Sequence, residues 1–307
     1  MPETLEIITQ TLRGRVLRGL QSATLAIGDR LPSARSLAKE FSVDFRLILS
    51  AYRALAREGL VDLRPRGGVY VAKQRAKGVL PLPESWLADI LTQALAREIP
   101  APDFHEWLRR CTETLRLRAV VIASTEDQVH GLCRELTDDF GLDAEGFTAD
   151  RVRGESPPPL AIRRADLLVT TGAHDSWVRE LGRQLKKDVT VVDVRPDLLG
   201  GEWSLLLRRP VYAVVGTEDF ARMLREFFAS SPGAENLHIL VLGRDDLTTI
   251  PAGAPTYVTQ RVRASLGSLE IRGRILPPAR TIRSESVREI FSFIVRSNLE
   301  AIAGRPH

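Results

Sequence analysis

From Arg118 onward the chain alternates short, mostly apolar runs with amphipathic segments, and this alternation restricts the fold more than any other feature of the sequence. Apolar runs at residues 119–123, 167–171 and 189–194 are separated by predicted helices at 127–140 and 175–187. Continuous apolar runs without strict alternation indicate strands buried on both faces, as in a parallel sheet covered by helices. The sequence therefore predicts an α/β fold for this region.

A second series of the same kind follows closer to the C-terminus. It comprises an apolar run at 211–215, a helix at 219–229, runs at 237–242 and 256–262, and a final helix at 285–303. Two successive series predict two α/β lobes and resemble a periplasmic-binding-protein-like sensor. A single larger sheet is the alternative.

The first 75 residues have a different pattern. Predicted helices at 4–20, 34–41 and 45–58 carry apolar residues three or four positions apart, and Ser33 and Asp44 stand where helix N-caps are expected. Two short apolar runs then flank the basic, glycine-containing segment 64–68. Three helices with a tight second turn, followed by a basic hairpin, predict a winged helix-turn-helix.

Three blocks within this region carry a family resemblance: Gly28 to Ala38, Leu55 to Val61, and Gly67 to Val71. Together they resemble the signature of the GntR family. The resemblance covers residues 1–75 and implies a DNA-binding transcription regulator, with a repressor favoured over an activator. By this resemblance, Ser33 and Arg35 at the start of the second helix contact phosphates or base edges.

The third helix departs from the usual family pattern at Asp44, Phe45 and Arg46. Asp44 repels phosphates unless it serves only as a cap, and Phe45 either contacts a thymine methyl group or packs internally. Arg46 is therefore the principal candidate for base recognition. The complete predicted DNA-binding set is Arg30, Ser33, Arg35, Ser36, Asp44, Phe45, Arg46, Arg64, Arg66 and Gly67.

The charge distribution agrees with a polyanion partner at the N-terminal end. Residues 1–77 contain 14 Lys and Arg against 7 Asp and Glu, whereas the whole chain has a net charge of only +4. Local basic excess supports DNA binding because neutralised phosphates release condensed counterions. We expect a homodimer on a double-stranded, pseudo-palindromic operator.

Between these regions, residues 73–83 lose periodicity and include three residues typical of turns, Gly78, Pro81 and Pro83. Helical patterns at 84–98 and 103–117 follow, and their apolar stripes suit either core or dimer packing. The predicted domains are therefore a winged helix at 1–75, connecting helices at 76–117, and an effector-binding or dimerisation domain at 118–307.

Ligands of open parallel sheets bind beyond the carboxyl ends of the strands, near helix N-termini. These positions give a candidate site for an unknown small-molecule effector, polar or anionic. The alternative for each hydroxyl is simple helix capping. The residues are Ser124, Thr125, Thr170, Thr171, His174, Gly216 and Thr217.

Several other classes of protein are disfavoured. The chain has no apolar run long enough for a membrane span and no signal peptide, so a cytoplasmic location is expected. Its two cysteines, Cys111 and Cys133, are not spaced as metal ligands. We expect no cofactor and no enzyme activity, since Lys186 and Lys187 are the only lysines after Lys77 and suit a pyridoxal phosphate site poorly. A purely dimerising C-terminal domain remains the main alternative.

Overall fold

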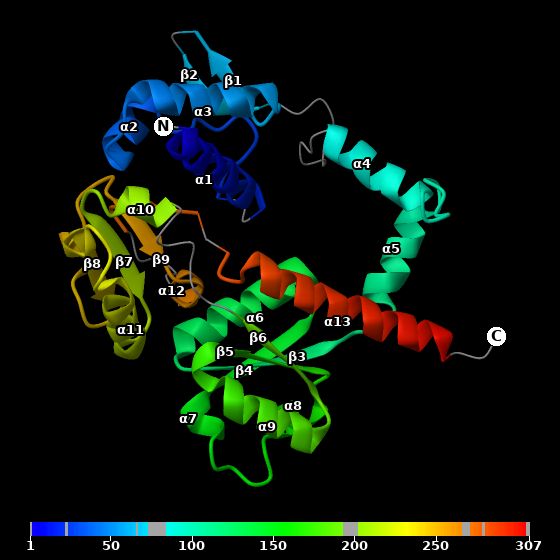
Figure 1. Ribbon diagram of the computed structural model, residues 1–307. Helices are drawn as coiled ribbons and strands as arrows, with labels where there is room; N and C mark the ends of the chain where they lie inside the picture. Colours follow the sequence, from blue (N-terminus) through cyan, green and yellow to red (C-terminus); the bar gives the residue numbers. More distant parts are fainter. Residues whose placement is uncertain are drawn as a thin grey trace. The chain divides into compact units, whose positions relative to one another are not determined.

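The computed structural model describes residues 2–21, 24–65, 67–72, 84–192, 202–265, 271–277 and 280–304 (Figure 1). The chain forms two compact units, each built from two separate stretches. The first unit comprises residues 1–86 and 197–279, and the second comprises residues 87–196 and 280–307. The boundaries predicted at residues 75 and 117 follow the order of the sequence and do not coincide with these units.

The N-terminal part of the first unit is a winged helix-turn-helix, as the sequence predicts. Ser33 and Asp44 cap the second and third helices through their side chains. Gly59 ends the third helix with a φ of 74°, in the left-handed region that favours glycine. The elements are α1 (Pro2–Gln21), α2 (Ala34–Phe41), α3 (Phe45–Arg57) and the antiparallel strands β1 (Val61–Arg64) and β2 (Gly68–Val71).

The rest of the first unit is a four-stranded parallel sheet in the order β10-β9-β7-β8. Its strands are β7 (Val211–Val215), β8 (Leu237–Val241), β9 (Pro255–Val258) and β10 (Arg274–Ile275). Its helices are α10 (Glu202–Leu206), α11 (Glu218–Phe228), α12 (Gln260–Ser265), η2 (Ala234–Asn236) and η3 (Leu247–Thr249).

The strand predicted at 256–262 is wrong in its second half. The strand ends at Val258, and α12 begins at Gln260. Thr259 explains the change, because its Oγ1 accepts a hydrogen bond from the Val262 backbone nitrogen at 3.4 Å, as a helix cap does.

This sheet and the winged helix share one hydrophobic core. Leu205, Leu206 and Phe228 belong to the same buried cluster as Phe41 and Tyr52. A set of ion pairs lies beside this core. Arg15 of α1, whose side chain is 8% exposed, contacts Glu40 of α2 at 2.9 Å and Glu202 of α10 at 2.6 Å, and Arg274 also pairs with Glu40. Burial alone lowers the pKa of Arg15, but the two carboxylates outweigh it and raise that pKa above its ordinary value.

The second unit contains another four-stranded parallel sheet, in the order β4-β3-β5-β6. Its strands are β3 (Arg118–Ala123), β4 (Asp143–Thr148), β5 (Leu167–Thr171) and β6 (Asp188–Val192). Its helices are α6 (Glu126–Phe140), α7 (Ala149–Val152), α8 (Leu160–Arg164), η1 (Gly172–His174), α9 (Asp175–Leu185) and α13 (Ser284–Ala303).

Helices cover both faces of this sheet, which confirms the predicted parallel sheet (Figure 1). On one face, Val121 and Val169 pack with Leu136 of α6 and Ile290 of α13. On the other, side chains such as Ile122 pack with α7, α8 and α9. Strand β4 was not predicted from the sequence; among the described strands it lies at the edge and pairs with β3.

The connecting region contains the helices α4 (Glu84–Leu95) and α5 (Phe104–Glu113). Both are shorter than predicted. α5 packs against α13, and the buried Asn298 of α13 accepts a hydrogen bond from the Leu115 backbone nitrogen at 2.7 Å. Several large apolar side chains of α4 and α5 are solvent-exposed: Trp86, Leu87, Leu95, Trp107 and Leu108.

Candidate nucleic-acid interface and effector site

The start of α2 presents polar groups without burying them. Ser33 Oγ accepts a hydrogen bond from the Ser36 backbone nitrogen at 3.1 Å, which satisfies one of the free N–H groups of the helix. Arg35 and Ser36 are exposed beside it, while Leu37 and Phe41 anchor the opposite face in the core. The buried face fixes the helix and leaves the Arg35 guanidinium available to a partner.

The start of α3 explains the unusual Asp44 of the sequence. Its carboxylate accepts a hydrogen bond from the Arg46 backbone nitrogen at 2.7 Å, so it caps the helix as anticipated. Phe45 is 46% exposed and does not belong to the buried core. Arg46 is exposed next to it. Tyr52, whose pKa burial raises, donates from its hydroxyl to the Pro32 carbonyl at 2.7 Å and ties α3 to the start of α2.

The hairpin of β1 and β2 has the basic tip expected of a wing. The Arg64 guanidinium lies 4.0 Å from the centroid of the Tyr70 ring, and the Tyr70 hydroxyl donates to the Gly67 carbonyl at 3.0 Å. Gly68 has a φ of 110° and is the glycine that the turn requires. A Cβ there would also come within 3.3 Å of Arg30 Nε, which places Arg30 beside the wing. Arg66 lies outside the described residues.

The charges of these elements are not neutralised internally. Arg30, Arg35, Arg46 and Arg64 form no ion pair within the described part of the chain. The arginines of α1 differ: Arg13, for example, contacts Glu58 at 2.5 Å. The residues predicted to bind DNA, as far as the structure describes them, therefore lie on α2, α3, the wing and the segment leading to α2. The positive charge of their arginines is available to phosphates.

The predicted effector residues fall into two groups, one in each unit. In the second unit they lie at the carboxyl ends of β3 and β5, which are neighbours although β4 separates them in sequence. This is the point where the strand order reverses and where open α/β sheets bind ligands. Ser124 Oγ and His174 Nε2 are 2.9 Å apart across it. Thr170 has a structural role, since its hydroxyl donates to the Ile122 carbonyl at 2.8 Å, and Thr125 caps α6 by accepting from the Gln128 nitrogen.

Several residues that follow the strands of this sheet carry unsatisfied polar atoms. Thr171 is 6% exposed, and its Oγ1 has no hydrogen-bond partner among the described residues. The same holds for His174 Nδ1 and for two atoms that the sequence analysis missed, Gln128 Oε1 and Trp177 Nε1. Burial, and secondarily the positive charge of Arg153, lowers the pKa of His174. Gln128 and Trp177 lie in the first turns of α6 and α9. Including the first helical turn after each strand, and not only the strand end, would have identified them from the sequence.

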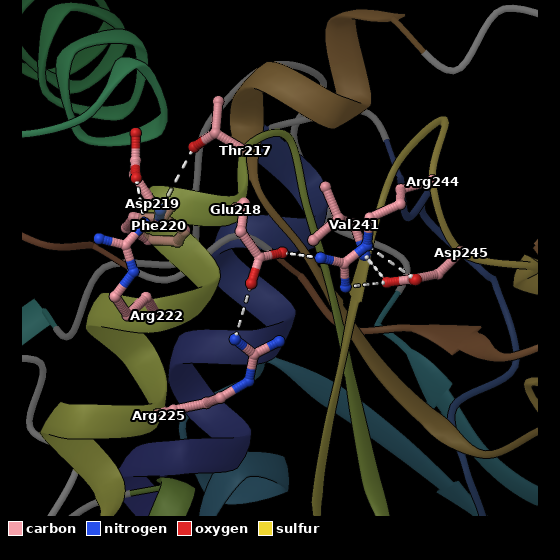
Figure 2. Close-up of polar contacts among 9 residues, drawn as sticks. All are labelled: Thr217, Glu218, Asp219, Phe220, Arg222, Arg225, Val241, Arg244 and Asp245. Atoms are coloured by element: carbon pink, nitrogen blue, oxygen red, sulfur yellow. Dashed lines mark hydrogen bonds and ion pairs between the residues drawn. The ribbon is translucent and has the colours of Figure 1, made fainter.

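The group in the first unit, Gly216 and Thr217, is arranged differently (Figure 2). Thr217 Oγ1 accepts a hydrogen bond from the Phe220 nitrogen at 3.3 Å and caps α11. Glu218 contacts Arg225 at 3.0 Å and also pairs with Arg244. The polar groups at the start of α11 thus bind one another, which favours the capping interpretation here.

The described residues offer neither a metal site nor a membrane-spanning helix. No group of three or more His, Cys, Asp or Glu side chains there is arranged to hold a metal ion. None of the helices described is both long enough and apolar enough to span a membrane.

Comparison with known proteins concerns the N-terminal region. Residues 8–71 match the model of the bacterial regulatory proteins of the gntR family. The chain is 24% identical to the HTH-type transcriptional repressor YtrA of Bacillus subtilis over 115 residues, which are 36% of this chain and 85% of that protein. It is 34% identical over 62 residues to the HTH-type transcriptional regulator Rv1152 of Mycobacterium tuberculosis, covering 20% of this chain and 51% of that one.

One solved structure also matches part of the chain. YtrA from Sulfolobus acidocaldarius, a GntR-family transcription factor, shares 27% identity over 33% of this chain and 84% of that chain, with a TM-score of 0.24. The similarity to GntR-family regulators thus lies in the N-terminal helix-turn-helix region, residues 8–71.

Proposed function

We propose that this protein is a transcription regulator that binds double-stranded DNA through its winged helix. The observation that carries the proposal is the set of unpaired arginines at the starts of α2 and α3 and on the wing, in a domain that matches the GntR model. In this geometry the N-terminal end of α3 enters the major groove, where Arg46 reads base edges while Arg35 and Ser33 bind phosphates.

The regulator acts as a homodimer on a pseudo-palindromic operator. Support comes from α4 and α5, where Leu95 is 63% and Trp107 is 42% exposed. A 12-residue helix such as α4 is only marginally stable in water unless its apolar stripe is buried. A second copy of the chain covers these stripes and brings two recognition helices to successive major grooves.

A small molecule bound in the α/β region modulates operator affinity, and the function is repression in the cytoplasm. The second unit supports the effector site, because four residues at or after the ends of β3 and β5 have polar atoms without partners among the described residues. The first turn of α6 already carries Glu126 and Asp127, and α9 begins with Asp175. These carboxylates complement the helix dipoles, so the ligand that fits best is neutral and rich in hydroxyl groups rather than anionic.

DNA recognition is tested by selecting bound sequences from a random duplex library with the purified chain and titrating the enriched site by fluorescence anisotropy. Arg46→Ala or Arg35→Ala should weaken specific binding by about 1–3 kcal/mol. Arg134→Ala is the matched control, because Arg134 lies on α6 and forms an exposed pair with Asp138 at 2.9 Å. Failure to enrich any sequence would overturn the proposal.

The effector is tested separately by thermal-shift screening of sugars, polyols and carboxylic acids, followed by anisotropy with each stabilising compound. A hit should stabilise the protein through mass action, change operator affinity, and lose its effect in His174→Ala. The competing function, a C-terminal region that only dimerises, predicts that no compound changes operator affinity.

A further inference from the structure

Two arginines of the second stretch of the first unit lie against the turn between α2 and α3. Arg208 Nη1 is 3.4 Å from the carbonyl oxygen of Phe41 and 3.5 Å from that of Ser42. Arg209 Nε donates to Ser42 Oγ at 2.8 Å. Ser42 ends α2 and stands two positions before Asp44, the cap of the recognition helix. A segment some 160 residues away in sequence thus borders the helix-turn-helix.

Buried residues directly before Arg208 and Arg209 hold the two arginines in position. Leu205, Leu206 and Leu207, which precede it directly, are all at most 2% exposed and belong to the core shared with the winged helix. Glu202, one turn earlier in α10, contacts the buried Arg15 of α1. The arginines therefore lie in a turn that the buried residues directly before it hold in place.

The charge of Arg208 and Arg209 is also available. Both are exposed, and neither forms an ion pair with any residue that the structure describes. Other arginines of the same α/β stretch differ, as Figure 2 shows: Arg222 contacts Asp219 at 2.6 Å, and Arg225 contacts Glu218 at 3.0 Å. Unpaired arginines are thus a property that this segment shares with Arg35, Arg46 and the wing.

We propose that Arg208 and Arg209 bind the phosphates that border the major groove entered by α3, so that the DNA-binding surface includes a part of the α/β region. The inference rests on the proposed DNA binding. In a helix-turn-helix the first helix crosses the DNA backbone and the second enters the groove, so the turn between them faces phosphates. Each guanidinium has five N–H donors, of which the turn engages one nitrogen, and the donors of the other nitrogens suit phosphate oxygens.

The test measures the salt dependence of DNA binding by the full chain. The probe is a fluorescein-labelled duplex of mixed sequence, titrated by anisotropy between 50 and 200 mM KCl. The slope of log K against log salt falls by about 0.9 for each phosphate that a variant no longer neutralises. Arg208→Ala/Arg209→Ala should therefore reduce the slope by about 1.8. Arg222→Ala/Arg225→Ala removes the same charge from the same stretch and should leave the slope unchanged.

Further variants separate phosphate binding from a structural role. Arg208→Lys/Arg209→Lys keeps the charge and should keep most of the slope, whereas Arg208→Gln/Arg209→Gln keeps amide donors for the turn and should reduce the slope as the Ala variant does. Ser42→Gly suits the positive φ of 50°, removes the hydroxyl that Arg209 contacts, and should not change the slope. If the slope measured for Arg208→Ala/Arg209→Ala equals the slope of the Arg222→Ala/Arg225→Ala control, this inference is overturned, but the proposed DNA binding is not. Absence of salt-dependent binding by the unmodified chain would overturn the proposed function as well.

Discussion

The two parallel sheets of this protein have the same strand order but opposite polar environments at the same topological position. In both, the first strand lies between the second and the third, and the fourth is next to the third. At the carboxyl ends of β3 and β5, Thr171 and His174 have polar atoms without partners among the described residues. At the end of β7, Thr217 and the carboxylates after it bind their own helix and nearby arginines.

This difference shows that the strand order of a sheet does not by itself identify a ligand-binding site. Both sheets offer the crevice where α/β proteins bind ligands, but the polar groups of the β7 edge engage one another, and its sheet shares a core with the winged helix. We interpret the β3–β6 sheet as the ligand-binding one and the β7–β10 sheet as the part that packs with the DNA-binding domain.

The largest expected effect concerns the buried charges of the first unit. Arg15→Ala leaves Glu40 and Glu202 without their main buried partner and should lower the free energy of unfolding by about 3–5 kcal/mol. Arg118→Ala in the β3–β6 sheet removes an exposed pair with Asp166, 52% and 36% exposed, and should cost less than about 1 kcal/mol. Urea denaturation followed by circular dichroism compares them. Equal destabilisation by the two variants would show that the buried cluster is not what attaches the β7–β10 sheet.

A smaller change in stability is expected at Gly146, where α6 packs closely on the β3–β6 sheet. At Gly146 of β4, a Cβ would lie 2.9 Å from the Val121 carbonyl oxygen and 2.7 Å from Val129 Cγ1. Gly146→Ala should therefore cost about 1–3 kcal/mol. Gly131→Ala, in α6 with open space around it, should instead stabilise by about 0.4–1 kcal/mol. Thermal unfolding of both variants is the measurement, and stabilisation by Gly146→Ala would contradict the packing.

Threonine replacements at the two strand edges should have opposite signs. Thr171→Val replaces an unsatisfied buried hydroxyl by a methyl group and should stabilise the ligand-free protein by about 1 kcal/mol. Thr217→Val removes the N-cap of α11 and should destabilise by about 1 kcal/mol. Chemical denaturation without added ligand tests both. Destabilisation by Thr171→Val would show that its hydroxyl has a structural partner.

The smallest effect is a pH dependence confined to the second unit. Because burial lowers the pKa of His174 in the folded state, the unfolded chain binds more protons as the pH falls below about 6.5. The stability associated with a neutral His174 is then present above that pH and is lost below it. His174→Gln should reduce the decrease in stability between pH 7 and pH 5, measured by denaturation at each pH. An unchanged pH profile would contradict the assigned burial.

The sequence predicted local elements well where capping and periodicity agree. Ser33 and Asp44 define the starts of α2 and α3, and both have the predicted capping roles. Strand β4 escaped prediction because Asp143–Thr148 has neither an apolar run nor clear alternation. Its place at the sheet edge comes from pairing with β3, and Gly146 is needed there for close approach.

Long-range contacts could not be predicted from local patterns. Arg15 has the sequence character of a surface helix residue, yet it is buried because Glu202, 187 positions away, pairs with it. The unpaired atoms of Gln128 and Trp177 likewise depend on how separate helices start at one sheet edge. The DNA-binding candidates on α2 and α3 were accessible to sequence reasoning because they are local to one motif.

The discontinuity of the first unit has a consequence for biosynthesis. Residues 1–86 emerge from the ribosome first, but residues 197–279, which complete their core, follow only after 110 residues of the second unit have been made. Because domains generally fold as units during synthesis, the apolar surface of the winged helix that awaits Leu205, Leu206 and Phe228 stays exposed in the nascent chain. A chain truncated before residue 197 lacks the residues that cover this surface, so we expect premature termination to yield a fragment prone to aggregation.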